Sequence, residues 1–159
     1  MLERFKVPEK DRVYVRQEKM RDVTEAMFRY NGVSVKDAQA SADVLMKNDL
    51  RGNESHGVSN GMRRYVREYV TNTINPTPEY KVVRESKTTM TIDADGALGT
   101  HIGPWAMQQA IDRAKDFGMA AVAVINSGHL AGCGYYAMMA ADQGMIGHCM
   151  TAGNTLSTV

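Results

Sequence analysis

The fold is decided by one stretch of the chain, Asn126-Ser127-Gly128-His129-Leu130-Ala131-Gly132-Cys133-Gly134-Tyr135-Tyr136. A continuous apolar run, 120–125, precedes it, and a helical pattern, 136–143, follows it. An apolar run that leads through glycines into a helix predicts a buried strand, a βα loop and a helix N-terminus. Ligands bind at such corners of α/β proteins, because strand ends and free helix N–H groups converge there. We therefore expect an α/β protein with a ligand site around His129, whose imidazole can exchange a proton near neutral pH.

The composition is that of an ordinary globular protein. The 159 residues are 43% hydrophobic and 23% charged, and the formal net charge is +1. These values give no sign of binding to nucleic acid or to a membrane, and no apolar run is long enough to span a bilayer. The two cysteines, Cys133 and Cys149, suggest no disulfide framework and predict a cytoplasmic protein. Cys133 is predicted to pack beside the loop and to take no part in catalysis.

The chain divides into three segments. We expect a flexible polar arm over 1–14, a helical part over 15–75 and the start of an α/β part over 76–159. Asn75-Pro-Thr-Pro78 is a rigid linker between the second and third segments.

Helical spacing of apolar residues predicts three helices in the second segment. They cover about 15–31, 34–50 and 58–70. Ser34 and Asp37 form a capping-box pattern, which places the start of the second helix at Ser34.

The third segment begins with two runs rich in Val and Thr. Residues 80–85 and 88–93 are predicted to form a β-hairpin. A helix is expected to follow, with Pro104 at its first position and Gly118 as its end.

The last part of the chain predicts a strand–helix–strand unit. The strands are expected at 120–125 and 145–150, with the helix of 136–143 between them. Such a crossover is right-handed and its strands are parallel.

The glycine loop contains no known nucleotide-binding fingerprint. Its glycines do not match G-x-G-x-x-G, so a Rossmann dinucleotide site is not supported. Two interpretations of His129 stay open: a loop histidine bonded to the backbone, or a proton-transfer group.

A second histidine lies between two predicted helices, in Ser55-His56-Gly57. It is either a capping or packing residue, or it converges with His129 on one substrate. His101 is expected in a helix-entry loop and His148 as a packed residue inside a strand. The spacing of the histidines and cysteines does not favour a metal site.

Several motifs come in the order found in one protein family. They are Asp49-Leu-Arg-Gly-Asn-Glu-Ser-His-Gly-Val58, Asn75-Pro-Thr-Pro78, Ala97-Leu-Gly99, the glycine loop, and Gly144-Met-Ile-Gly147. With these motifs the chain, from about residue 15 onward, resembles the malate/L-lactate dehydrogenase family of nicotinamide-dependent oxidoreductases. That group includes ureidoglycolate and sulfolactate dehydrogenases.

The resemblance implies a non-Rossmann fold that binds NAD or NADP. It implies hydride transfer between the nicotinamide and the hydroxyl-bearing carbon of a small 2-hydroxy acid such as malate or lactate. It also implies a homodimer or larger assembly with the active site near a subunit interface. Family members are longer than this chain, so we expect the chain to be a truncated N-terminal portion.

The resemblance also assigns roles to residues on both sides of the reaction. His129 and His56 become the candidate acid/base and substrate-orienting residues, and which of them moves the proton stays open. Thr151 and Gly153 are the candidates for contact with the cofactor.

Further positions are expected to bind the substrate. Ser55, Asn60 and Tyr65 match family positions near the substrate. Family members commonly carry an arginine where this chain has Asn60, so Arg63 or Arg64 is expected to bind the substrate carboxylate instead.

Two other functions remain open at this point. One is a non-catalytic fragment or dimerisation module of the same fold that lacks cofactor binding. The other is a metal-assisted hydrolase that uses the scattered histidines.

Overall fold

The structure is a computed structural model, and it describes residues 8–152. Within this range the chain is an α/β protein, as predicted, with α-helices, short 3-10 turns and one three-stranded sheet. The helices are α1 Gln17–Tyr30, α2 Val35–Leu50, α3 Val58–Val70, α4 Gly99–Phe117 and α5 Gly134–Ala141; the 3-10 turns are η2 Glu9–Asp11 and η3 Glu54–His56; the strands are β1 Lys81–Glu85, β2 Thr89–Asp93 and β3 Ala121–Ile125.

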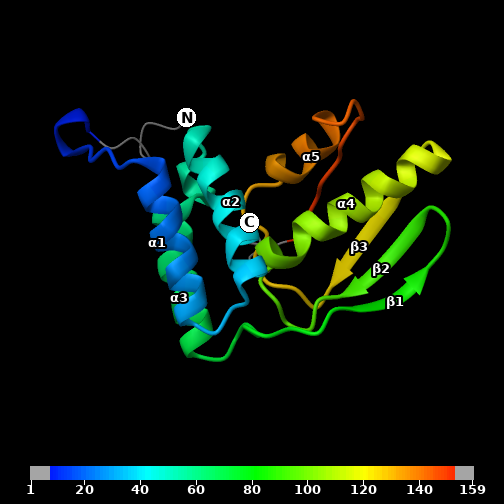
Figure 1. Ribbon diagram of the computed structural model, residues 1–159, viewed down its shortest axis with the longest axis horizontal. Helices are drawn as coiled ribbons and strands as arrows, with labels where there is room; N and C mark the ends of the chain where they lie inside the picture. Colours follow the sequence, from blue (N-terminus) through cyan, green and yellow to red (C-terminus); the bar gives the residue numbers. More distant parts are fainter. Residues whose placement is uncertain (1–7, 153–159) are drawn as a thin grey trace, which may run out of the picture.

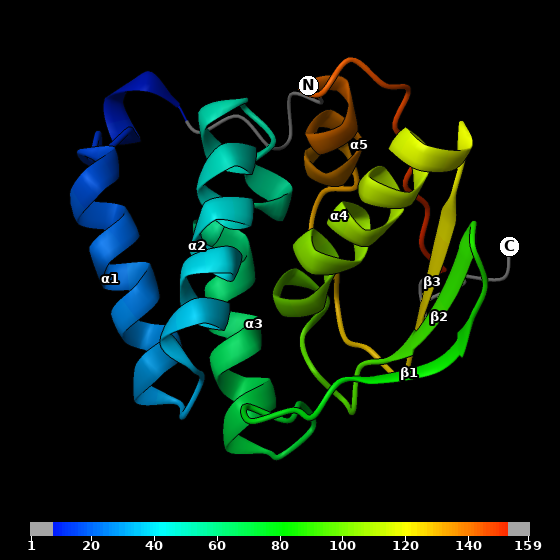
Figure 2. The ribbon, with the colours of Figure 1, turned by 45° about the vertical axis from the view of Figure 1, so that its right-hand side comes forward.

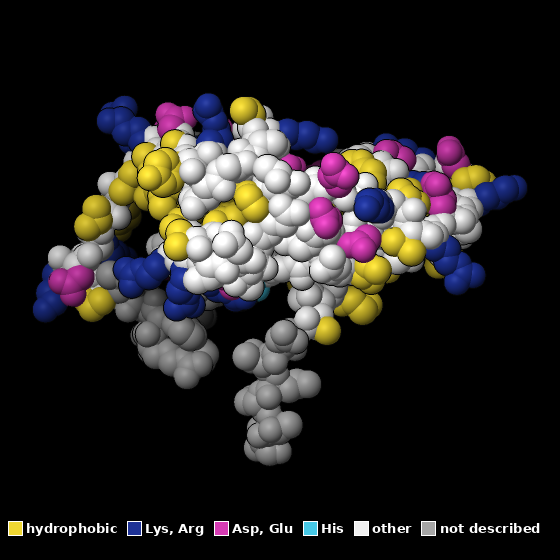
Figure 3. All heavy atoms as spheres, turned by 90° about the horizontal axis from the view of Figure 1, so that it is seen from below, with side chains coloured by type: hydrophobic (Ala, Val, Ile, Leu, Met, Phe, Trp, Pro, Cys, Tyr) yellow, Lys and Arg dark blue, Asp and Glu magenta, His cyan; other side chains and the backbone are white. Residues whose placement is uncertain are grey.

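The elements form a helical half and a sheet half (Figure 1). Helices α1, α2 and α3 pack side by side, and α4 and α5 lie between them and the sheet (Figure 2). α4 covers one face of the sheet. Seen from below, apolar side chains gather over the helical half, while charges of both signs are scattered over the sheet half (Figure 3).

The start of α2 confirms the predicted cap. The Asp37 N–H donates to the Ser34 hydroxyl oxygen at 3.1 Å, and the Ser34 hydroxyl donates to the Asp37 carboxylate at 2.8 Å. In a standard capping box the acidic side chain accepts from the serine backbone N–H, whereas here the Asp37 carboxylate accepts from the serine hydroxyl. The predicted bounds of the third helix, 58–70, agree with α3.

Aromatic residues fill the core of the helical half. The Phe28 ring stacks on Tyr65 at a centroid distance of 6.4 Å and meets Tyr69 edge-on at 6.4 Å. His101 joins them from α4, and its Nε2 lies 3.0 Å from the Tyr69 hydroxyl. Because α4 supplies a ring to this core, the two halves share packed side chains.

The sheet has the order β1-β2-β3. β1 and β2 form the predicted hairpin, and β2 runs parallel to β3, with Thr89 opposite Ala121 and Asp93 opposite Ile125. The parallel unit of the structure is therefore β2-α4-β3.

The strand predicted at 145–150 is absent, so the predicted parallel pair of 120–125 with 145–150 is wrong. The chain turns at Gly144 and packs back on α5, where the Met145 N–H donates to the Ala140 oxygen at 3.0 Å. No described residue pairs with the second edge of β3. The interpretation of His148 as a packed strand residue is also wrong, because His148 is exposed.

The start predicted for α4 is wrong as well. Pro104 lies inside the helix, which begins five residues earlier at Gly99. Residues 99–103 are buried, so tertiary packing of this first turn extends the helix past the position that the proline alone favours. His101 therefore belongs to the helix and not to an entry loop. None of the helices between residues 8 and 152 has the length and apolar character needed to cross a membrane.

Candidate active site

The glycine loop after β3 is fixed by the segment that enters α4. The Gly128 N–H donates to the Ala97 oxygen at 2.7 Å, and the Gly96 N–H donates to the Asn126 oxygen at 2.9 Å. A side-chain carbon at Gly99 would lie 2.7 Å from the Gly128 oxygen. Glycine at the start of α4 therefore lets the loop backbone approach the helix closely.

The far side of the loop is fixed by two further contacts. The Tyr136 hydroxyl donates to the Leu130 oxygen at 2.9 Å. A side-chain carbon at Gly132 would overlap the Asn48 side-chain oxygen, so this glycine lets the loop lie against α2. His129 is thus held between the helical half and α4.

The second histidine is positioned by the junction of α2 and α3. Asp49, near the end of α2, accepts a hydrogen bond from the Val58 N–H at 2.8 Å and so caps the start of α3. Its other oxygen is buried without a partner, and burial raises the pKa of this carboxyl. A side-chain carbon at Gly57 would overlap the Asp49 carboxylate, so glycine must follow His56. Nothing in the spacing identifies this role of Asp49; the polarity of the junction was its only signal.

The structure brings His56 and His129 together. Their rings stack with a centroid distance of 5.9 Å and an interplanar angle of 18°. His56 Nδ1 lies 2.9 Å from the Ser55 hydroxyl oxygen, and His129 Nδ1 lies 2.8 Å from the Tyr65 hydroxyl oxygen. Within residues 8–152 neither Nε2 atom has a hydrogen-bond partner, so both remain available to a ligand.

The surroundings of His129 keep it neutral. Burial lowers its pKa first, and the charges of Arg64 and His56 lower that pKa further. Burial also raises the pKa of Tyr65 well above its ordinary value, so its hydroxyl stays protonated. The Ala131 N–H also donates a weaker hydrogen bond to His129 Nδ1 at 3.4 Å. A neutral half-buried imidazole with one ring nitrogen held and the other free is suited to accept a proton.

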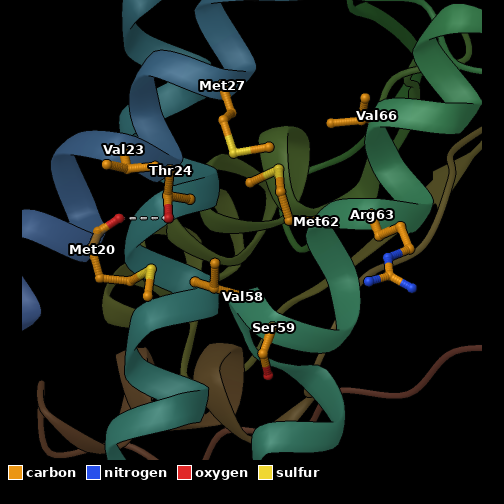
Figure 4. Close-up of a pocket in the computed structure, with 9 residues that line it drawn as sticks. All are labelled: Met20, Val23, Thr24, Met27, Val58, Ser59, Met62, Arg63 and Val66. Atoms are coloured by element: carbon orange, nitrogen blue, oxygen red, sulfur yellow. Dashed lines mark hydrogen bonds between the residues drawn. The ribbon is translucent and has the colours of Figure 1, made fainter. Parts of the chain in front are cut away.

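The two candidate arginines lie on different sides of α3. Arg64 acts electrostatically on His129, and its Nε pairs with the Glu68 carboxylate at 2.7 Å. Arg63 lines an apolar groove of about 440 Å³ on the side that faces α1 (Figure 4). The groove is lined by Met20, Val23, Thr24, Met27, Val58, Ser59, Met62, Arg63 and Val66. Of the two, the structure therefore brings only Arg64 near the histidine pair.

The other predicted site residues take different places. The Asn60 amide donates to the Ser55 backbone oxygen at 2.7 Å, so it holds the turn that carries His56. Thr151 is exposed near the end of the described chain. Gly153 lies outside the described residues.

Comparison with known proteins agrees with this architecture. A sequence model of the malate/L-lactate dehydrogenase family matches residues 15–158. Malate dehydrogenase of Pyrococcus horikoshii is 44% identical over 125 residues, which are 79% of this chain and 34% of that protein. L-sulfolactate dehydrogenase of Methanocaldococcus jannaschii is 41% identical over 76% of this chain and 35% of its own length.

The fold is similar to solved structures of the same group. The structure of malate dehydrogenase from Pyrococcus horikoshii superposes with a TM-score of 0.80 at 38% identity, and the match covers 83% of this chain and 38% of that one. This chain thus spans about a third of the length of the curated relatives that it matches. The family match covers most of the chain, and the chain belongs to the malate/L-lactate dehydrogenase family.

Proposed function

We propose that this chain supplies the acid–base half of an NAD(P)-dependent dehydrogenase that acts on a small 2-hydroxy acid. The observation that carries the proposal is the stacking of His56 on His129, with Tyr65 behind His129 and both Nε2 atoms free. The relatives named malate and L-sulfolactate dehydrogenase support it, since malate, lactate and sulfolactate are 2-hydroxy acids.

His129 is the proposed base. For Nε2 to accept a proton, His129 must carry its own proton on Nδ1 and donate it to the Tyr65 oxygen at 2.8 Å, which fixes the plane of the ring; the weak bond from the Ala131 N–H to Nδ1 is then given up. The substrate hydroxyl then gives its proton to Nε2, and in the reverse direction the same nitrogen returns the proton to the alkoxide. The bound nicotinamide supplies the hydride acceptor.

His56 and Arg64 are proposed to orient the substrate. His56 presents its free nitrogen beside His129, and Ser55 holds its other nitrogen. Arg64 adds a positive charge near His129, which favours an anion at this position. The Asn60 amide already donates to the Ser55 backbone oxygen, so Arg64 is the better candidate to bind the substrate carboxylate.

The cofactor side rests on the family resemblance. We assign Thr151 and Gly153 to contact with NAD or NADP, without a preference between the two. The residues that fit a nicotinamide reaction in this chain are His129, whose lowered pKa favours the neutral imidazole, and Arg64, whose Nε is paired with Glu68. We also propose that the protein is a homodimer in the cytoplasm.

The test is a nucleotide-binding and activity assay on the protein translated from its complete reading frame. Fluorescence titration with NADH and NADPH reports binding, and oxidation of malate, lactate and sulfolactate reports activity. His129→Ala should reduce the rate of oxidation by roughly 10²-fold or more and leave nucleotide binding intact. His148→Ala is the matched control, because His148 is exposed and lies outside the site.

The three outcomes of this assay lead to different conclusions. Nucleotide binding together with turnover that depends on His129 supports the proposed dehydrogenase function. Nucleotide binding with turnover that survives His129→Ala moves the base to another residue and overturns the assignment. Failure to bind either nucleotide leaves a non-catalytic module of this fold.

A further inference from the structure

The chain doubles back along α5. After the turn at Gly144, the Met145 N–H donates to the Ala140 oxygen at 3.0 Å. Gly147 then lies so close to the Ala137 backbone that a side-chain carbon at residue 147 would overlap its oxygen. The returning segment therefore runs antiparallel to the helix and in contact with it.

This register brings the two cysteines together. Cys149 is two residues beyond Gly147, a distance of about 6.6 Å for extended chain, and Cys133 is four residues before Ala137, a distance of about 6 Å along a helix. Cys149 thus returns to the start of α5, beside Cys133. Cys149 packs against the core cluster that contains Tyr136, whose hydroxyl bond to the loop backbone holds the loop in place.

We propose that Cys133 and Cys149 form a redox pair that closes to an intramolecular disulfide on reaction with a low-molecular-weight disulfide such as oxidised glutathione. The sulfurs of a disulfide are about 2.05 Å apart, so the two thiols must approach. Residues 145–150 pair with no strand of the described sheet, so no ladder hydrogen bond has to break for this approach. Intracellular disulfides of this kind are commonly reversible and redox-sensing.

The exchange proceeds in two steps. The Cys133 thiolate attacks one sulfur of glutathione disulfide, the S–S bond breaks, and one glutathione leaves. Cys149 then loses its proton, its sulfur attacks the Cys133 sulfur, and the second glutathione leaves. Two protein thiols are oxidised and one glutathione disulfide is reduced to two thiols. Cys133 attacks first because burial raises the pKa of the Cys149 thiol to about 12.

The bridge would join two parts of the site. Cys133 ends the glycine loop that carries His129, and Cys149 leads to Thr151. The formation of the bridge depends only on the two thiols and their register, so it is independent of the proposed dehydrogenase function.

The test is peptide mapping of the full-length protein after incubation with oxidised glutathione. Non-reducing digestion and mass spectrometry should show one species in which the peptides of Cys133 and Cys149 are joined, with the mass of two hydrogens lost. Dithiothreitol should separate the peptides. Only single glutathione adducts, or only cross-links between chains, would overturn the proposal.

Two glycine variants test the register while they keep both thiols. Gly147→Ala should slow bridge formation about tenfold, because the added carbon pushes the segment off α5. Gly134→Ala is the matched control, since a side-chain carbon there meets nothing within 4 Å, and it should bridge at the wild-type rate. Equal rates in the two variants would show that the contact of Gly147 with α5 does not bring the thiols together. Circular dichroism confirms that both variants are folded.

Discussion

At the scale of single residues, each histidine of the candidate site has one ring nitrogen that is already hydrogen-bonded to a neighbouring hydroxyl. Tyr65 holds one nitrogen of His129, and Ser55 holds one nitrogen of His56. Each ring is thereby oriented with its other nitrogen free. The hydrogen bond made by one ring nitrogen helps to determine which nitrogen of a catalytic histidine carries the proton.

The pH dependence of the reaction follows from the lowered pKa of His129. A base with a lowered pKa stays deprotonated as the pH falls, so the acid limb of kcat/KM for 2-hydroxy-acid oxidation should lie below the ordinary histidine pKa of about 6.5. Arg64→Gln removes one cause of the shift and should move the limb to higher pH. Arg67→Gln, on the same helix, is the control. A wild-type limb at or above 6.5 would contradict the assignment of His129 as the base.

His101, in the core of the helical half, should make the free energy of unfolding depend on pH. Burial lowers the pKa of His101 to about 4, and its Nδ1 has no partner. Because the unfolded chain binds the proton more tightly, the free energy of unfolding is highest above about pH 6.5 and falls as the pH drops toward 4. The loss should reach up to about 3 kcal/mol.

Urea unfolding at neutral and acid pH measures this effect. His101→Gln should abolish most of the pH dependence, because glutamine does not titrate. His148→Gln, at an exposed position, should keep it. An equal acid-induced loss in wild type and His101→Gln would assign the effect to other groups.

At the scale of elements, the junction of α2 and α3 depends on the absence of a side chain at Gly57. The Asp49 carboxylate occupies the space beside Gly57 and caps α3 at Val58. The turn that carries His56 is therefore fixed by the end of one helix and the start of the next.

A double-mutant cycle tests this junction. Gly57→Ala should lower the free energy of unfolding by about 2 kcal/mol, because the added carbon displaces the carboxylate. Asp49→Ala should cost about 1 kcal/mol through the lost cap. In the Asp49→Ala background, Gly57→Ala should cost much less, because the overlap is gone. Additive costs, measured by urea unfolding, would contradict the packing described.

Local patterns predicted the elements whose ends are set locally. The bounds of α3 and the start of α2 follow from spacing and from the Ser34 cap, and the hairpin follows from its Val- and Thr-rich runs. Local patterns did not predict where α4 starts or that residues 145–150 pack back on α5, because both depend on contacts with other segments. His129 and His56 became candidates through their positions beside glycines at the ends of predicted elements, and the family resemblance added their roles; that the two rings meet needs the fold, since they are far apart in sequence.

At the scale of the whole molecule, buried polar contacts join the helical half to the sheet half. The Ser41 hydroxyl on α2 lies 2.7 Å from the Thr100 hydroxyl on α4, and both residues are fully buried. Tyr69 on α3 and His101 on α4 form a second such pair. We therefore expect the two halves to unfold together.

Two probes in different halves test this cooperativity. Trp105, the only tryptophan, stacks on Tyr80 at 6.3 Å and reports on the sheet half, while far-ultraviolet circular dichroism is dominated by the helices. Their urea midpoints should coincide. Thr100→Val should lower the free energy of unfolding by about 1–3 kcal/mol, because it leaves the Ser41 hydroxyl buried without a partner.

The double variant Ser41→Ala with Thr100→Val is the control for that loss. It removes both hydroxyl groups and should recover part of the stability. Midpoints that differ between the two probes would show that the halves unfold independently.

The stacking of His56 on His129 has a spectroscopic consequence. Each imidazole lies in the ring-current field of the other, so the magnetic environment of each ring depends on the position and charge of its neighbour. The charge of His56 is also one of the causes that lower the pKa of His129, after burial and the charge of Arg64. The imidazole resonances of His129 therefore report, in a single spectrum, both the proton on its own ring and the position of the neighbouring His56 ring.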